Sequence, residues 1–311
     1  MNKVHSDWIK RNCPSCGLDN LPKNPEVKSS SSAESLSFAE VSKFFIGIRK
    51  DQVFFSYYRC ESCKLLYCPW YFSQSQLDEL YAIMPDNSMG NEKKALLKTQ
   101  NSYVKNLSKD IHKVKSYLEI GPDIGLVANR IIEKFNPDRS LLIEPNLNIH
   151  EELKKNTCNG SEVGIATSLT NIDLYQPDLT VGVHVYDHLL LPLNEIRDIF
   201  ERSKNNSTIV IVIHNESSFL RKILNKKWPP FCLQHPQIYN KKTIRKLLMQ
   251  CGWSEIRISS TTNWYYLDNL LKLASNIVGL NHKLVSWVPK FQVPIKLGNI
   301  IVVARKAEDF T

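Results

Sequence analysis

The chain has 311 residues, of which 42% are hydrophobic and 23% charged, and its formal net charge at pH 7 is +9. This length allows one large domain and one small one, and the composition is that of a globular protein. The first residues lack the apolar core of a signal peptide, and no apolar run approaches the length of a membrane span. We therefore expect a cytoplasmic protein, whose eight cysteines are thiols or metal ligands rather than disulfides.

The positive charge is concentrated in one segment. No acidic residue lies between Glu216 and Glu255, and this stretch contains Arg221, Lys222, Lys226, Lys227, Lys241, Lys242, Arg245 and Lys246. An excess of lysine and arginine favours anionic partners such as nucleic acid, nucleotide-linked sugars or acidic surfaces. We expect this basic segment to face a negatively charged molecule.

Two Cys-x-x-Cys pairs mark the amino-terminal part, namely Cys13 with Cys16 and Cys60 with Cys63. Four thiolates in two matched pairs form the closed tetrahedral arrangement that is typical of structural zinc. Residues 53–59 predict a strand that leads into the second pair. We therefore predict a zinc-ribbon region in residues 1–83, and we expect Cys68, which has no partner in the pattern, to be a buried core cysteine.

Residues 84–115 are predicted to connect this region to a second domain. The segment 84–93 is polar and contains turn-forming residues, whereas apolar residues in 95–114 recur at intervals of three and four. The sequence therefore predicts a linker followed by a helix.

Residues 116–135 have the pattern of a strand, a tight turn and a helix. The apolar run stops at Gly121, and the turn closes at Gly125. Glycines in such a turn let the backbone pass close to a ligand, and the helix amino end attracts anions. The next apolar run ends in Glu144, 23 positions after Gly121, where a carboxylate can bind two ribose hydroxyls. The pattern thus predicts a cofactor that contains a nucleoside.

Strands and helices continue to alternate beyond this point. Further strands are expected at 163–166, 177–186, 207–213, 254–260 and 298–305, with amphipathic helices between them. Such alternation predicts a doubly wound α/β sheet. Two segments interrupt it, an insert at about 216–240 and a helical excursion at about 265–290. With its basic charge, Trp228 and two histidines, the insert predicts a surface that binds an anionic, partly planar molecule.

The pattern Glu119-x-Gly121-x-x-x-Gly125 with Glu144 resembles the first two motifs of the class I S-adenosylmethionine (SAM) methyltransferases. Asp123 occupies the place of the family's middle glycine. The passage that begins at Cys60 resembles the ribbon-to-helix passage of zinc-ribbon methyltransferases, which include sugar C-methyltransferases. Residues 184–192 resemble their His-x-Leu-Glu-His-x-x-x-Pro passage, with Asp in place of Glu.

The resemblance implies a Rossmann-like seven-stranded sheet in residues 116–311, with the last strand antiparallel. It also implies a set of cofactor-binding residues: Glu119, Gly121, Pro122, Asp123, Gly125, Glu144, Pro145, Thr167 and His184. Asp187 and His188 would be the polar pair nearest the transferred methyl group, and Tyr81 or Tyr103 could cover the cofactor.

An oxygen or carbon acceptor needs a base to remove its proton. The candidates are His188, which we expect first, and His214, His235 and Tyr239. The resemblance thus implies SAM-dependent methyl transfer to a small anionic acceptor, in particular a sugar nucleotide or saccharide precursor. Two alternatives stay open: an RNA methyltransferase that uses the basic segment, and a non-catalytic binding module, because Asp123 departs from the motif. The sequence does not indicate an oligomeric state.

Overall fold

The structure is a computed structural model that describes residues 4–46, 53–84, 93–109, 111–157, 162–170, 175–278 and 290–308. Its strands are β1 (Ile9–Lys10), β2 (Ser31–Ser32), β3 (Val53–Phe54), β4 (Tyr58–Arg59), β5 (Leu66–Tyr67), β6 (Trp70–Tyr71), β7 (Ser116–Ile120), β8 (Arg139–Ile143), β9 (Glu162–Ala166), β10 (Leu179–Val183), β11 (Thr208–His214), β12 (Gln237–Ile238), β13 (Ser254–Ser260), β14 (Asn263–Tyr266), β15 (Gln292–Ile295) and β16 (Asn299–Arg305). Its α-helices are α1 (Phe38–Val41), α2 (Gln74–Ala82), α3 (Lys93–Leu107), α4 (Leu126–Phe135), α5 (His150–Thr157), α6 (Pro192–Arg202), α7 (Phe219–Leu224), α8 (Lys241–Gln250) and α9 (Leu267–Val278).

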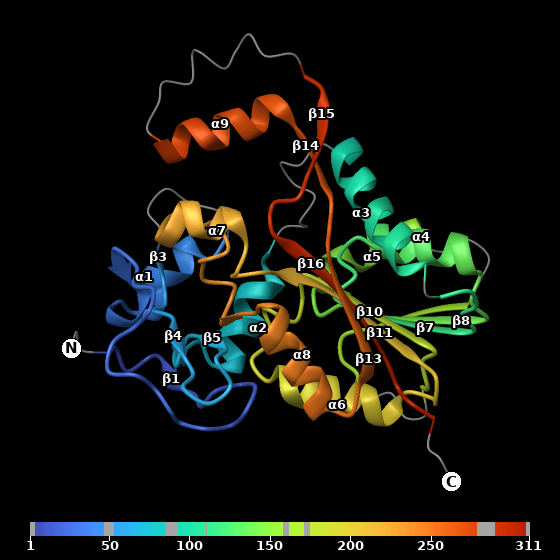
Figure 1. Cartoon of the computed structure of the whole chain (residues 1–311), viewed down its shortest axis with the longest axis horizontal. Helices are drawn as coiled ribbons and strands as arrows, with labels where there is room; N and C mark the ends of the chain where they lie inside the picture. Colours follow the sequence, from blue (N-terminus) through green and yellow to red (C-terminus); the bar gives the residue numbers. More distant parts are fainter. Residues whose placement is uncertain are drawn as a thin grey trace.

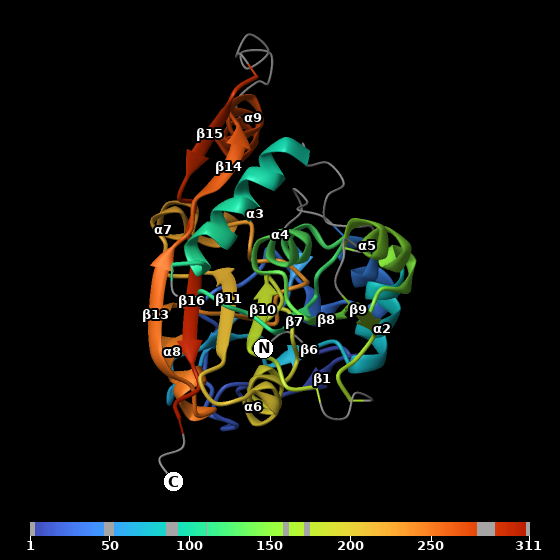
Figure 2. The same cartoon turned by 90° about the vertical axis from the view of Figure 1, so that its right-hand side faces the viewer.

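Seven strands form one central sheet in the order β13-β16-β11-β10-β7-β8-β9 (Figure 2). The strands from β11 to β9 pair in parallel, whereas β16 is antiparallel to both of its neighbours. This arrangement confirms the predicted Rossmann-like sheet with an antiparallel last strand. The chain proceeds outward from β7 to β9 and then continues on the other side from β10. The carboxyl ends of β7 and β10 therefore form the switch point at which open α/β sheets bind ligands.

Helices cover both faces of the sheet, and the alternation of side chains along β11 shows how. Its isoleucines, Ile209, Ile211 and Ile213, pack in one core cluster with α6 and α8. Its valines, Val210 and Val212, pack in another cluster with α3 and α4. A strand that is apolar at every position is buried on both sides, as parallel sheets in α/β proteins require.

The amino-terminal region and the insert after β11 fold together beside the sheet (Figure 1). Strand β12 of the insert pairs with β5, which pairs with β4. A separate core cluster unites aromatic side chains from both segments, including Phe54, Phe72, Trp228 and Phe231. Trp228 is only 2% exposed, so it does not form part of a free binding surface as we expected for the insert.

The predicted helices and strands occur with shifted ends. The helix expected at 95–114 is α3, which ends at Leu107, and the run at 53–59 divides into β3 and β4 because these pair with different strands, β2 and β5. The expected excursion is represented by β14, α9 and β15, which project away from the sheet in Figures 1 and 2. Residues 85–92 of the linker and 279–289 of the excursion lie outside the described residues. Among the helices described, none combines the length and the apolar composition needed to cross a bilayer.

One carboxyl group lies inside the sheet. Glu119 on β7 is 1% exposed and bonds to the hydroxyl of Tyr117, two residues earlier on the same strand. Burial raises the pKa of Glu119 from its usual 4.5 to about 8, and the nearby carboxylates of Glu144 and Asp123 add to the effect of burial. Glu119 is therefore protonated at neutral pH, in contrast to a carboxylate that binds a ligand at the surface.

The raised pKa predicts that the protein loses stability as pH rises from about 4.5 to 8. In this range the unfolded chain releases the Glu119 proton while the folded chain retains it, which costs up to about 1.4 kcal/mol per pH unit. In Glu119→Gln the contribution of this residue to the slope should be absent, as measured by urea unfolding at several pH values. Glu133→Gln, at a partly exposed position on α4, should keep the slope, and equal slopes in all three proteins would contradict the prediction.

Candidate functional site

The turn between β7 and α4 has a backbone that few residues can adopt. Gly121, Asp123 and Gly125 have φ values of +63°, +54° and +78°. A Cβ atom on Gly121 would lie 2.5 Å from Cγ2 of Val185, so this glycine lets the turn approach the loop after β10. Aspartate adopts the left-handed conformation more readily than most residues, which explains how Asp123 replaces a glycine here.

Glu144, directly after β8, ties this turn to the next loop. Its Oε2 accepts a hydrogen bond from the backbone N–H of Asp123 at 3.0 Å, and its Oε1 accepts one from Asn146 at 2.9 Å. The side chain is 7% exposed, and burial raises its pKa although both hydrogen bonds lower it. A carboxylate has about four acceptor positions. Two therefore remain for a ligand beside the glycine turn.

The other predicted cofactor residues lie in the same row of loops. Pro122 belongs to the turn, Pro145 follows Glu144, Thr167 directly follows β9, and His184 directly follows β10. These positions are the carboxyl ends of β7, β8, β9 and β10, which are neighbours in the sheet. Glu119 is the exception, because its carboxyl group lies within β7.

Three of the four predicted base candidates come together beyond β10 and β11. His188 and His235 meet with their Nε2 atoms 3.0 Å apart, and the rings of His214 and His235 are 4.9 Å apart. His184 stacks near His214 at a ring distance of 4.6 Å. Tyr239 does not join this histidine cluster: it is fully buried, and its hydroxyl is 3.4 Å from the backbone oxygen of Tyr186.

Asp187 lies at the centre of the histidine cluster. It is 0% exposed, and its Oδ2 lies 2.6 Å from Nδ1 of His214, which donates the hydrogen bond. Its other oxygen, Oδ1, has no hydrogen-bond partner among the described residues and is 3.9 Å from Nε2 of His188. Burial opposes ionisation, but the hydrogen bond from His214 and the nearby histidines hold the pKa of Asp187 well below its usual range. Asp187 is therefore a buried carboxylate.

The imidazoles of the cluster differ in the direction in which their pKa is shifted. Burial and the neighbouring His235 lower the pKa of His188 to about 3, and burial with His214 does the same for His184. Burial also opposes protonation of His235, but Cys232, Asp187 and the Pro230 carbonyl raise its pKa to about 9. Burial lowers the pKa of His214, although its bond to Asp187 opposes that effect. His184, His188 and His214 are therefore neutral at pH 7.

Sequence reasoning undervalued two contributors to this cluster. Asp187 was expected beside the methyl group but not at the centre of the histidine cluster. Its position between His184 and His188 at the end of a strand was the sequence feature that could have indicated this. Tyr81 on α2 was expected only as a cover over the cofactor, whereas its hydroxyl lies 3.2 Å from Nδ1 of His188. Tyr103, the other candidate cover, is 3% exposed and packs in the core with α4.

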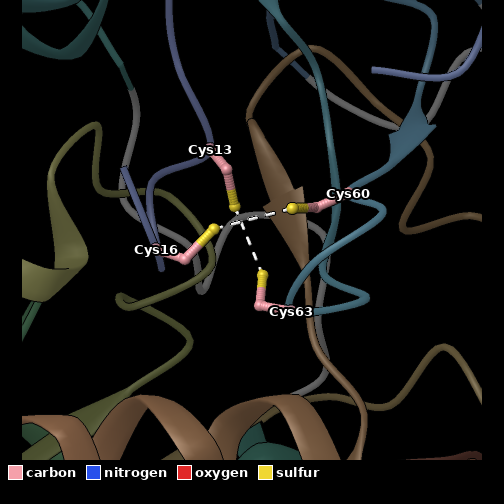
Figure 3. A group of neighbouring side chains, drawn as sticks. All are labelled: Cys13, Cys16, Cys60 and Cys63. Carbon is pink, nitrogen blue, oxygen red and sulfur yellow. Dashed lines mark hydrogen bonds between the residues drawn. The ribbon is translucent and has the colours of Figure 1, made fainter. Parts of the chain in front are cut away.

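The four predicted metal ligands also converge (Figure 3). The sulfur atoms of Cys13 and Cys63 are 3.4 Å apart, and those of Cys16 and Cys60 are 3.6 Å apart. Tetrahedral zinc with bonds of about 2.3 Å places its sulfur ligands about 3.8 Å apart, so the four thiols fit such an ion. Cys68 is 1% exposed and bonds to the Phe55 carbonyl, as expected for a core cysteine.

Part of the basic segment forms an exposed face on α8. Lys241, Lys242, Arg245 and Lys246 are all exposed and line a surface depression together with Met249 and Gln250. The helix begins two residues after Tyr239, which bridges to Asn215 just beyond β11. The basic face therefore starts near the edge of the sheet that carries the histidine cluster. Arg221 differs, since it pairs with Glu26 at 3.7 Å.

Comparison with known proteins identifies the family of this chain. The family described as a methyltransferase domain matches residues 94–257, which is more than half of the chain. No curated protein matches the chain. The matched residues include the glycine turn, Glu144 and the histidine cluster.

Many solved structures share the fold at low identity. A chain in the complex of a methyltransferase activator and a methyltransferase from Haloferax volcanii is 9% identical, with a TM-score of 0.51 over 70% of this chain and 94% of that one. NodS, an N-methyltransferase from Bradyrhizobium japonicum in complex with S-adenosylhomocysteine, is 13% identical, with a TM-score of 0.49 over 75% of this chain and 98% of that one. Because the family model matches more than half of the chain, the chain belongs to the methyltransferase-domain family, and it is a class I SAM-dependent methyltransferase with a Rossmann-like fold.

Proposed function

We propose that the row of loops at the carboxyl ends of β7 to β10 holds SAM. The remaining acceptor positions of Glu144 take the ribose hydroxyls, and the glycine turn at Gly121 to Gly125 gives the methionine part access to the backbone. Thr167 and Pro145 flank the adenine, and the backbone at His184 follows the methionine part. The observation that carries this proposal is the place of Glu144 beside the turn, with both oxygens fixed by backbone N–H groups.

We further propose that His214 is the general base. Bound SAM supplies an electrophilic methyl group, so the protein's own task is to position the acceptor, exclude water and remove a proton. Asp187 accepts the Nδ1 proton of His214, which leaves Nε2 as the basic atom. His188 is less suited than we expected, since Tyr81 and His235 engage both of its nitrogens.

The acceptor that we propose is a small anionic molecule of the sugar-nucleotide class. Support comes from the exposed basic face of α8, because lysine and arginine bind diphosphates through charge-assisted hydrogen bonds. Arg221 contributes less to anion binding than its charge implies, because it forms an ion pair with Glu26. RNA, which a basic face also attracts, is the alternative that the acceptor experiment below distinguishes.

We propose that the four cysteines bind a structural zinc ion. We also propose that the chain has three parts. The zinc-ribbon region spans residues 1–83, the linker and α3 lie in 84–115, and the methyltransferase domain spans 116–311. The convergence of the four sulfurs supports the ion. The shared core of the amino-terminal region and the insert supports a structural rather than a catalytic role for this region.

Replacing Glu144 tests the cofactor site. Glu144→Gln keeps the size of the side chain but removes the charge and one pair of acceptor positions, so SAM should bind about 10- to 100-fold more weakly. Isothermal titration with SAM and S-adenosylhomocysteine measures this. Glu151→Gln, at an exposed position on α5, should bind SAM normally. Absence of SAM binding to the folded wild-type protein would favour the non-catalytic binding module.

Removing two charges from α8 tests the acceptor class. In the double variant Lys241→Gln/Lys242→Gln, KM for a nucleoside-diphosphate sugar should rise about 5- to 10-fold with kcat nearly unchanged, because these lysines bind the ground state and transition state equally. The matched double variant Lys154→Gln/Lys155→Gln on α5 should leave KM unchanged. Labelled SAM reports the transfer. Methylation of RNA instead, with binding that weakens steeply between 50 and 200 mM salt, would overturn the small-molecule assignment.

Substitution of one cysteine tests the zinc site. A thiol-blocking mercurial should release one equivalent less zinc from Cys16→Ser than from the wild-type protein. The free energy of unfolding of this variant should also fall by about 3 kcal/mol or more. Cys251→Ser is the control, since Cys251 is a free cysteine that does not belong to the four-cysteine group. If Cys16→Ser and Cys251→Ser release the same amount of zinc as the wild-type protein, the four cysteines do not bind the ion.

A further inference from the structure

We propose that the protein has a second metal site, in which Asp187, His188 and His235 bind a divalent transition-metal ion. The ligand atoms are Oδ1 of Asp187 and Nε2 of both histidines. These three residues can each direct one ligand atom to a common point, and these atoms all lie within 4.8 Å of one another. The site belongs to the histidine cluster at the edge of the sheet and is separate from the four cysteines.

The measured separations are those of metal ligands. Two nitrogen or oxygen atoms that are each about 2.1 Å from one ion lie about 3.0 to 3.4 Å apart at octahedral or tetrahedral angles. The Nε2 atoms of His188 and His235 are 3.0 Å apart, which is also hydrogen-bond distance, so an ion would take the place of the proton between them. The distance from His188 Nε2 to Asp187 Oδ1 is 3.9 Å, about half an ångström beyond that range, which a small rotation of the carboxylate closes.

Partners behind the ligands orient both histidine rings. Nδ1 of His235 lies 2.6 Å from the carbonyl oxygen of Pro230, which can only accept, so this nitrogen carries a proton. Nε2 is then the nitrogen that can bind an ion, and the ion would displace the second proton that the ring carries at pH 7. Nδ1 of His188 lies 3.2 Å from the hydroxyl of Tyr81, which can accept its proton in the same way. Metal-bound histidines usually have such a partner on the other ring nitrogen.

The carboxylate gives an independent reason for an ion. Oδ1 of Asp187 is buried without a hydrogen-bond partner among the described residues, although the side chain is 0% exposed. An ionised oxygen buried without a partner is costly, and a cation among two imidazoles and this oxygen would satisfy it. Oδ2 is already bound by His214, so the carboxylate is held with Oδ1 directed to the histidine pair.

A second trio, His184 with Asp187 and His214, also satisfies the distance requirement. It is less suited to an ion, because His214 Nδ1 and Asp187 Oδ2 are only 2.6 Å apart, closer than two ligands of one ion, and Oδ2 already accepts this hydrogen bond. His214 therefore acts as a positioning residue for the ligand Asp187.

The donor set indicates the class of metal and its role. Two imidazoles and one carboxylate favour zinc or a similar divalent transition ion over calcium or magnesium, and three protein ligands leave coordination positions open. The side chain of His188 is 21% exposed, so an open position can be reached from outside. This role rests on the proposed methyl transfer: an acceptor oxygen bound there would be polarised next to His214, its proposed base.

The test uses the full-length protein and Zn²⁺ alone, with metal content measured by mass spectrometry after dialysis. The wild-type protein should hold two equivalents, of which the mercurial releases only one. His188→Gln should hold one equivalent, all of it released by the mercurial, and its affinity for the second ion should fall at least about 100-fold. His112→Gln is the control, because this histidine is exposed and outside the cluster.

His235→Gln is the second variant, and it should lose the same equivalent. SAM titration of each variant shows whether the domain is folded and separates this proposal from the cofactor proposal. A wild-type protein with a single, mercurial-released equivalent would overturn the second site even if SAM binds normally. Two equivalents retained by both histidine variants would overturn the ligand assignment.

Discussion

The arrangement of the site depends on one pairing, that of β12 with β5. The pair joins Gln237 to Tyr67 and Ile238 to Leu66, and it fixes the insert after β11 to the amino-terminal region. His235 lies two residues before β12, so this pairing sets its position. Because His214 ends β11 and His188 lies in the loop after β10, the histidine cluster is complete only when the amino-terminal region, the insert and the sheet are folded together.

Further contacts fix the orientation of the amino-terminal region. Apart from the aromatic core that it shares with the insert, Arg59 donates two hydrogen bonds of 2.8 Å to the buried carboxylate of Glu216 and also bonds to Glu26. A buried ion pair gives little net stability when both charges must be desolvated, but it disfavours any arrangement that leaves one of them alone. The contact therefore acts mainly as a constraint on orientation, and zinc at the cysteines would strengthen it.

Sequence reasoning was most reliable where local pattern determines structure. The glycine turn, the alternation of strands and helices and the two Cys-x-x-Cys pairs follow from spacing and hydrophobic period, because the residues of each pattern are neighbours in sequence. The seven-stranded sheet with its antiparallel last strand was implied by the family resemblance. The expectation that Trp228 lies on a binding surface was wrong. A tryptophan in a basic segment can be exposed or buried, and the sequence does not distinguish the two cases. It could not reveal that His214 and His235 join His184 and His188 around Asp187, because both are distant from Asp187 in sequence.

The two ends of the site have different constraints, and this bears on how acceptors can differ among proteins of this fold. The cofactor end is built from backbone: Gly121 must lack a side chain because Val185 occupies the space, and Glu144 is fixed by two N–H groups. The proposed acceptor end is built from side chains: His188 and His214 follow the sheet strands, and His235 lies on the insert. A fold of this kind is common to many methyl acceptors, so under the proposed function the choice of acceptor would depend on the residues around Asp187 rather than on the sheet.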